Sequence, residues 1–247
     1  MNELIYVYGV TPNDNCEIAF NNLSALYEYV PESEFGEGSF QNNLQNTEWL
    51  TEKALAHQTT LEQAAKEKIV IPFKFGSIFK SADNVVQMLK EKHQQFELLL
   101  EKLREREEWG IKLFYESTSL TSWIEEHHET ITQLNTELKN STPGKAFLLK
   151  KQYETKIREA VKAEINAVRQ QLYTEIQTLT DHFKLEKETD RSLTREKGIN
   201  TLNLPILIQK TKVDQVQTLV ENYRKNYGER GFSLELTGPW PPYNFVD

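Results

Sequence analysis

Six apolar segments along the chain predict β-strands. The first, residues 4–10, is a nearly unbroken run of β-branched and aromatic residues, so we expect a strand that is buried on both faces. Residues 24–31 predict a second strand that pairs with the first. The other four segments are residues 69–79, 108–117, 199–209 and 232–238.

Two of these predicted strands contain a proline, which places them at the edge of a sheet. Pro72 and Pro205 have no backbone N–H to donate to a neighbouring strand. Gly76 follows Pro72 closely and permits a sharp turn or a close approach of the backbone. We therefore expect residues 69–79 and 199–209 to form edge strands or to contain a bulge.

Apolar residues at helical spacing alternate with these strands. Residues 47–68 predict a helix, whole or split near Thr59 and Thr60, with His57 beside its apolar face. Residues 34–46 are rich in Gly, Asn and Ser and predict a loop.

Further helices follow in the rest of the chain. Ser81 or Asp83 caps a helix that runs to about Glu108, where a run of charged residues marks a domain boundary. Additional helices are predicted for residues 117–140, 145–187 and 212–230.

The long helix at 145–187 carries an informative apolar stripe. Its members recur in two eleven-residue units, which suits a nearly straight helix with one packing neighbour. That neighbour is either the 119–139 helix or a partner protein. We favour the 119–139 helix because a short turn joins the two. The stripe consists of Val161, Ile165, Val168, Leu172, Ile176, Leu179 and Phe183.

The order of these elements predicts an α+β protein with two α/β domains near the ferredoxin-like plan. The N-terminal domain covers residues 1–108 and the C-terminal domain residues 109–247. The second domain is expected to hold a long, coiled-coil-like helical pair, about residues 119–187, that projects outward, and a C-terminal tail.

Composition narrows the classes of function. The 247 residues carry a net charge of -8, which argues against nucleic acid and against attachment to an anionic membrane. No apolar run is long enough to span a membrane, and the N-terminus does not have the pattern of a signal peptide. The lone Cys16 fits a reducing cytoplasm. The basic stretch at 150–162 is interrupted by Glu154 and Glu159 and is expected to be a solvated helix face.

The sequence shows no constellation of catalytic residues. It has no Gly-rich phosphate loop and no nucleophile elbow. His127 and His128 are adjacent, so on a helix they point about 100° apart and do not suit one metal ion. We therefore expect no enzyme activity, no metal and no cofactor.

The tail has an unusual composition for a terminal segment. Residues 238–245 combine a glycine, three prolines and three aromatic residues. The Pro-x-x-Pro pattern is typical of polyproline ligands, but no arginine flanks it. The tail either packs on its own domain, with Trp240 and Tyr243 covering exposed core, or docks a partner.

Four of these stretches together resemble the gas vesicle protein family GvpF/GvpL. They are residues 4–10, 69–79, 109–115 and 236–246, of which the Gly-Pro-Trp-Pro-Pro-Tyr tail is the most specific. Residues 142–152 and 202–208 also look like that family. Lys74 departs from the pattern, because the family often has an arginine before Phe-Gly, and Gly-Ser stands where Gly-Thr is frequent. Any role that needs a planar guanidinium there is in doubt.

The resemblance implies an accessory protein of gas vesicle formation rather than an enzyme. It implies binding to the hydrophobic shell protein and to other accessory proteins during nucleation and assembly, and a location at the gas vesicle in the cytoplasm. It also implies two α/β domains, the second with a coiled-coil-like helical pair. The alternative is a minor structural component that is retained in the finished vesicle shell.

A carrier of an aggregation-prone shell protein would need an edge strand or an apolar groove. The candidate protein-binding residues are Phe73, Phe75, Trp240, Tyr243 and Phe245, whose simpler interpretation is core packing. Two further alternatives are an enzyme that uses a cleft between the domains and a scaffold that dimerises through the long helix.

Overall fold

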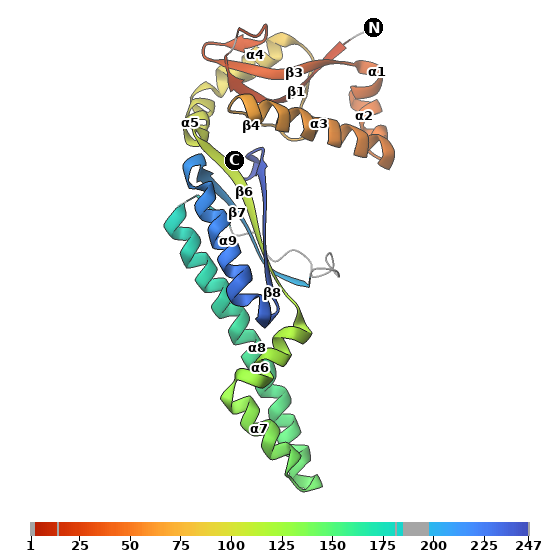
Figure 1. Ribbon diagram of the computed structural model, residues 1–247. Coiled ribbons are helices and arrows are strands. Elements are labelled where there is room, and N and C mark those ends of the chain that lie inside the picture. The colour runs from red at the N-terminus through yellow and green to blue at the C-terminus, as the bar shows by residue number, and fades with distance from the viewer. Residues whose placement is uncertain (1–2, 14, 181, 185–197, 247) are drawn as a thin grey trace. The chain divides into compact units, whose positions relative to one another are not determined.

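The computed structural model describes residues 3–13, 15–180, 182–184 and 198–246, which form two compact units. One unit comprises Met1–Glu108 with Pro239–Asp247, and the other comprises Trp109–Gly238 (Figure 1). Each unit mixes helix and sheet, as the sequence predicts. The tail at 239–246, which the sequence analysis assigned to the second domain, belongs to the first unit.

The sheet of the first unit is built on β1 (Glu3–Pro12). Its antiparallel partner is β3 (Leu23–Pro31), and the pairing runs from Glu3 opposite Pro31 to Pro12 opposite Leu23. The remaining strands are two residues long: β2 (Ala19–Phe20) on β3, and β4 (Ile71–Pro72) and β5 (Ile78–Phe79) on β1. The first two predicted strands and their pairing are thus confirmed.

The prediction of one continuous strand at 69–79 is wrong, because the strand is interrupted. Pairing with β1 stops after Pro72 and resumes at Ile78. Between them the chain turns at Gly76, whose φ of 82° lies in the left-handed region that favours glycine. Pro72 lies on β4, which ends the strand order, so its expected edge position is confirmed.

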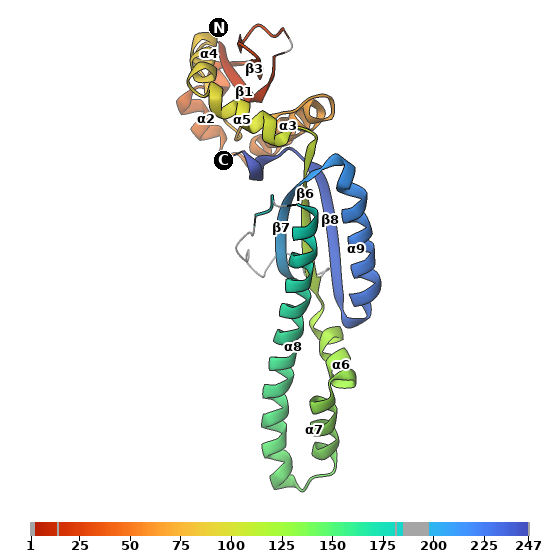
Figure 2. The same cartoon turned by 90° about the vertical axis from the view of Figure 1, so that its left-hand side faces the viewer.

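The helices of the first unit surround this sheet (Figure 2). The loop expected at 34–46 is wrong, because that segment forms most of two short helices. There the Phe35 and Phe40 rings pack on Trp49, and this tertiary packing outweighs the local preference of Gly and Asn. The helices are α1 (Glu32–Phe35), α2 (Glu37–Asn43), α3 (Thr47–Glu67), α4 (Ala82–Glu91) and α5 (His93–Leu103).

Three helix predictions in this unit are refined by the structure. The helix at 47–68 is one continuous α3, without a split at Thr59 and Thr60. Ser81 caps α4 by accepting from the backbone N–H of Asn84. The helix expected to reach Glu108 breaks at Lys92 and ends at Leu103, because β6 already begins at Arg106.

The core of the first unit lies on both faces of β1, as its apolar run predicts. Tyr6 and Tyr8 pack with Leu61 of α3 on one face. Ile5 and Val7 pack with Val85 of α4 on the other.

The second sheet has the strand order β7-β6-β8. Its strands are β6 (Arg106–Tyr115), β7 (Ile199–Gln209) and β8 (Phe232–Trp240). Pro205 therefore lies on an edge strand, as predicted. The helices α8 (Pro143–Leu179) and α9 (Val213–Tyr227) pack against each other beside this sheet (Figures 1 and 2).

The predicted helix at 117–140 is divided at His128 into α6 (Ser117–His127) and α7 (Glu129–Lys139). Both contact α8, so the long helix has the intramolecular neighbour that we favoured. Val168, Leu172 and Ile176 of the predicted stripe are buried in the core of this unit.

The end of the long helix differs from the prediction. α8 stops at Leu179, and Thr180 has an extended backbone. Phe183, the last expected member of the stripe, forms an isolated β-bridge with Ile206 instead. Residues 185–187 of the predicted helix lie outside the described residues.

Candidate docking surface on the first unit

The tail is fixed to the first unit by its last described residues. Phe245 is buried, and Lys102 donates from Nζ to the Phe245 carbonyl at 2.8 Å while its ammonium lies 5.6 Å from the ring centroid. Asn244 donates from its backbone N–H and from Nδ2 to the two carboxylate oxygens of Glu108, at 3.0 and 2.7 Å. The tail is therefore part of the unit's own packing.

A histidine links the tail to the sheet and to the 73–77 turn. The Tyr6 hydroxyl lies 2.9 Å from His57 Nδ1, and His57 Nε2 lies 2.9 Å from the Tyr243 hydroxyl and 3.2 Å from the Phe73 carbonyl. The backbone N–H of Gly76 donates to the Tyr6 oxygen at 3.0 Å. Tyr6 can then donate to Nδ1, and Nε2 carries the ring proton that the Phe73 carbonyl accepts.

Burial keeps this network neutral. It lowers the pKa of His57 and raises the pKa values of Tyr6 and Tyr243 to about 12. Since the histidine favours its neutral form and both phenols stay protonated at neutral pH, the three groups suit a structural clamp. A general base would need a pKa near the operating pH and access to a substrate.

Beside this clamp lies a groove with a volume of about 530 Å³. Its walls come from four parts of the first unit: the 71–79 segment, α4, α5 and the tail. Lys74 and Lys92 contribute charge, and the other side chains are largely apolar. The apolar lining of the groove includes Phe73, Met88, Phe96, Leu99, Tyr243 and Val246.

The five candidate residues do not share one surface. Phe73 and Tyr243 line the groove. Phe75 instead packs in a cluster with Phe40 and Trp49. Phe245 is buried, whereas Trp240 is 43% exposed and is not part of the groove lining.

Sequence reasoning missed the helical side of this surface. Met88 lies on α4, and Phe96 and Leu99 lie on α5, within the segment for which the sequence predicts one helix and no binding residue. His57 was placed beside an apolar face, but its hydrogen-bond partners lie 51 and 186 residues away in the sequence. Only the three-dimensional pairing of β1, α3 and the tail reveals them.

The other expected edge, on β7, is partly occupied. The Leu207 N–H donates to the His182 carbonyl at 2.9 Å, and the Lys184 N–H donates to the Pro205 carbonyl at 3.0 Å. The short segment at 182–184 therefore uses hydrogen-bonding positions that a partner strand would need there.

Within the described ranges, no group of three or more His, Cys, Asp or Glu residues could hold a metal ion. Among the helices of the same residues, none combines the length and apolar character that a membrane crossing requires.

Comparison with known proteins places the chain in a family. The family model for the gas vesicle synthesis protein GvpL/GvpF matches residues 4–247. The chain belongs to this family. The resemblance in the strands and the tail is thereby confirmed, and membership supports a role in gas vesicle formation.

Individual relatives and a solved structure agree with this result. The chain is 25% identical to gas vesicle protein L of Streptomyces sp. (strain CB03234), over 91% of this chain and 80% of that protein. It is 26% identical to gas vesicle protein L of Haloferax mediterranei, over 82% of this chain and 63% of that protein. The crystal structure of gas vesicle protein GvpF from Anabaena sp. PCC7120 has a TM-score of 0.70 at 17% identity, covers 99% of this chain and 98% of its own, and shows a shared fold.

Proposed function

We propose that this chain is an accessory protein of gas vesicle formation that binds the hydrophobic shell protein, and other accessory proteins, during nucleation and assembly. We place it at the gas vesicle in the cytoplasm and assign it no catalytic role. Family membership supports the process. The groove beside Phe73 is the observation that carries the binding step.

The groove favours an apolar segment as the bound group. Met88, Leu99 and Val246 are apolar side chains on α4, α5 and the tail, so a bound chain would bury carbon surface against three elements at once. Each apolar side chain so buried stabilises a complex through removal of its surface from water. A shell protein that is soluble only when its apolar face is covered fits this surface.

Side chains rather than strand pairing are proposed to hold the shell protein. β4 and β5 have two residues each, which is too short to template a new strand. Pro72 and the exposed Lys74 are also typical of edges that resist pairing with other chains. The apolar side chains of the groove walls, rather than the backbone of β4 or β5, are therefore proposed to contact the shell protein.

The other candidate residues support this surface in the proposal. Phe75 anchors the 73–77 turn in the aromatic cluster, and Phe245 anchors the tail. Trp240 lies at the start of the tail and is proposed to contact the partner, because the residue is 43% exposed.

Two finer features of the fold also belong to this proposal. The two units are proposed to be variations on the ferredoxin-like plan. The α6, α7 and α8 helices are proposed to act as a coiled-coil-like arm that contacts other accessory proteins. Exposed Phe147 and Leu148 near the start of α8 support a contact there.

A capture experiment tests the binding step. The folded chain would be immobilised and mixed with the shell protein, alongside the variants Met88→Glu and Val246→Glu, whose side chains line the groove without being fully buried. Leu98→Glu is the matched control, since Leu98 lies on α5, is 67% exposed and does not line the groove.

We expect the groove variants to lose the shell protein and the Leu98→Glu variant to keep it, with circular dichroism spectra unchanged in all three. Equal capture by groove and control variants would refute the groove. Failure of the intact chain to capture any shell protein would refute the carrier role and make the other accessory proteins the partners to test.

The alternative is a minor structural component of the finished shell. Quantitative protein analysis of washed vesicles separates the two functions. A carrier is depleted by washing, whereas a shell component stays at a fixed ratio to the shell protein.

A further inference from the structure

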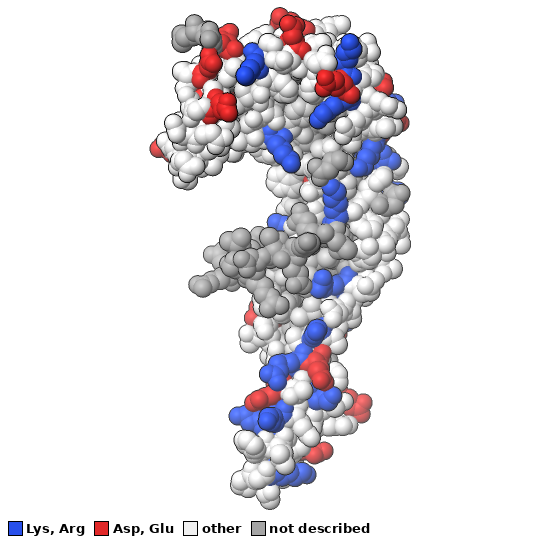
Figure 3. Space-filling model, turned by 180° about the vertical axis from the view of Figure 1, so that it is seen from behind, with Lys and Arg blue, Asp and Glu red and all other residues white. Residues whose placement is uncertain are grey.

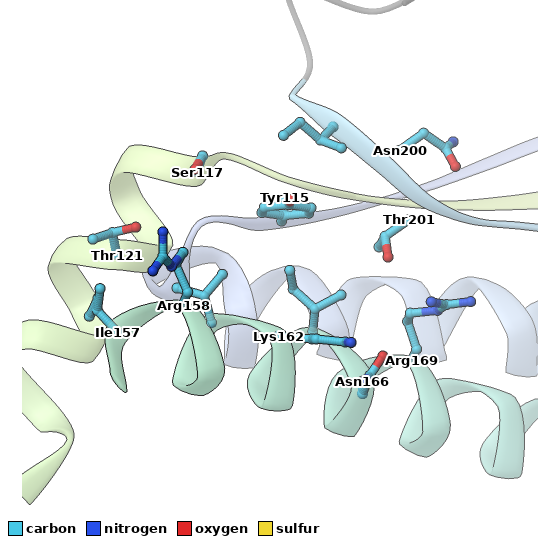
Figure 4. A pocket seen from close by; sticks show the side chains of 13 residues that line it. Tyr115, Ser117, Thr121, Ile157, Arg158, Lys162, Asn166, Arg169, Asn200 and Thr201 are labelled. Carbon is cyan, nitrogen blue, oxygen red and sulfur yellow. The ribbon is translucent and has the colours of Figure 1, made fainter. Parts of the chain in front are cut away.

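A pocket in the second unit has a chemistry unlike that of the groove. It has a volume of about 500 Å³ and lies between α8, the end of β6 and the start of β7 (Figure 4). Tyr115, Ile157 and Val161 supply apolar walls. Its size falls within the usual range for pockets that bind small molecules.

Among the described residues, the charged side chains that line this pocket are cations. They are Arg158, Lys162 and Arg169, and no carboxylate is among the lining residues that the structure describes. This concentration of positive charge stands on a chain whose net charge is -8. In Figure 4, the labelled cations follow one another along α8, on the side where β6 and β7 run.

Two exposed cations of the pocket lie one turn apart on α8. Arg158 and Lys162 are four residues apart on α8, and like charges at this spacing repel. Two neighbouring carboxylates are engaged elsewhere: Glu159 pairs with Lys156 at 2.9 Å and Glu164 with Arg230 at 2.7 Å. In the described parts of the chain, neither Arg158 nor Lys162 has a carboxylate within ion-pair distance.

The basic stretch at 150–162 was expected to be a solvated face interrupted by acidic residues. Its basic residues are exposed, as expected, and they fall into two groups, because Lys156 pairs with Glu159 while Arg158 and Lys162 line the rim of the pocket. The space-filling view shows Lys and Arg side chains recurring along the second unit (Figure 3). Helical spacing thus sorts one basic stretch into a paired part and a pocket-lining part.

Neutral hydrogen-bond donors complete the pocket. Thr121 on α6 and Asn166 on α8 line it, and so does Thr201 on β7, whose side chain is buried. Hydroxyl and amide groups beside two cations are the donor set that a phosphate oxygen takes.

We propose that this pocket binds a phosphorylated small molecule. Its phosphate lies between Arg158 and Lys162, and its apolar or planar part lies against Tyr115. The proposal concerns the second unit alone and does not depend on the binding of the shell protein by the first unit.

Isothermal titration calorimetry on the full chain tests it, with ADP, pyrophosphate and adenosine as the probes. The double variant Arg158→Gln/Lys162→Gln removes the two cations. The matched control is Lys150→Gln/Lys151→Gln, which removes two charges from exposed positions of the same helix outside the pocket. Arg158→Lys keeps the charge and controls for packing.

We expect saturable binding of ADP to the natural chain, weakened about tenfold or more in the pocket variant because charge-assisted hydrogen bonds are lost. The Lys150 and Lys151 control and Arg158→Lys should bind within a few-fold of the natural chain. Adenosine should bind more weakly than ADP. Pyrophosphate binding would assign recognition to the phosphates alone, and its absence would assign part of the affinity to the planar group.

Three results would overturn the proposal. The first is that neither ADP nor pyrophosphate binds saturably at millimolar concentrations. The second is an equal loss of binding in the pocket variant and in the Lys150 and Lys151 control. The third is equal binding of adenosine and ADP. A melting curve serves as a second readout, because ADP should raise the melting temperature of the natural chain and leave that of a folded pocket variant unchanged.

Discussion

Asn244 donates two hydrogen bonds to Glu108, from its backbone N–H and from Nδ2, one to each carboxylate oxygen of a residue that is only 4% exposed. A buried carboxylate needs such donors, since burial without them is costly. The tail is therefore bound to the first unit through a charged group and not through apolar contact alone.

Replacing Asn244 tests how much this contact contributes. Asn244→Ala removes the Nδ2 donor, and we expect the free energy of unfolding to fall by roughly 1.5–3 kcal/mol, as for other hydrogen bonds to charged groups. Asn244→Asp should lower the free energy of unfolding further, because it puts a second carboxylate beside that of Glu108. Urea unfolding measures both. Asn140→Ala is the control, since its side chain is exposed, and an equal loss there would contradict the assignment.

The His57 clamp predicts a dependence of stability on pH. Burial lowers the pKa of His57 in the folded chain, so the unfolded chain binds the proton more readily. The contribution to stability is fully present above the unfolded pKa of about 6.5 and is lost as the pH falls below it toward the folded pKa. We expect unfolding free energies to decrease between pH 7 and 5, by at most about 1.4 kcal/mol per pH unit for this one proton.

The variant His57→Gln isolates that proton. It should be less stable than the natural chain at pH 7 and should lack this part of the slope, because glutamine does not titrate. Urea unfolding at several pH values gives the slopes, and hydrogen exchange of the first-unit amides localises the effect. Parallel slopes for the two chains would exclude His57 as the source.

Arg230 joins three elements of the second unit. Its guanidinium lies 4.7 Å from the Trp123 ring centroid and 4.8 Å from that of Tyr227, and it pairs with Glu164 at 2.7 Å. Arg230→Lys keeps the charge but loses the planar stacking. We expect a loss of roughly 1–2 kcal/mol in unfolding free energy.

The exposed pair of Arg104 with Glu101 is the control for that substitution. Arg104→Lys should change the unfolding free energy by less than about 0.5 kcal/mol, as is usual at exposed sites. If both substitutions cost the same, the stacking on Trp123 and Tyr227 contributes nothing measurable.

Replacement of glycine by alanine should have opposite effects on stability at Gly9 and at Gly144. A Cβ on Gly9 would lie 2.4 Å from the Ile71 carbonyl oxygen, so Gly9→Ala should push β4 away and cost roughly 1–3 kcal/mol. Gly144 lies in the first turn of α8, where such a Cβ would meet no described atom within 4 Å beyond its chain neighbours and the helix's own nearby backbone, so Gly144→Ala should stabilise the chain by about 0.4–1 kcal/mol. Thermal unfolding measures whether each variant is less or more stable than the natural chain.

The sequence predicted those parts of the fold whose signals are local and periodic. The apolar run of β1 and the stripe through Val168, Leu172 and Ile176 both identify buried faces, and the structure places them there. Pro72 and Pro205 lie on edge strands for the same local reason, the missing N–H.

What sequence reasoning missed depends on contacts between distant residues. The segment at 34–46 has loop composition, and only the packing of Phe35 and Phe40 on Trp49 makes it helical. The same holds for the candidate surface. Phe73 and Phe75 are two residues apart, yet Phe73 lines the groove and Phe75 joins the aromatic cluster. In a regular strand the two side chains would lie on the same face, but here the backbone has left the strand.

Because the tail packs in the first unit, the two units do not become able to fold completely in the order in which they are translated. Residues 239–246 contribute Phe245 and the partner of Glu108, but a ribosome completes the whole of the second unit before it reaches them. The first unit to be translated is thus the last to be finished. Until then, the space that Phe245 will fill and the groove wall that Tyr243 and Val246 will form are open, so a nascent chain lacks the surface with which the complete protein is proposed to hold its partner.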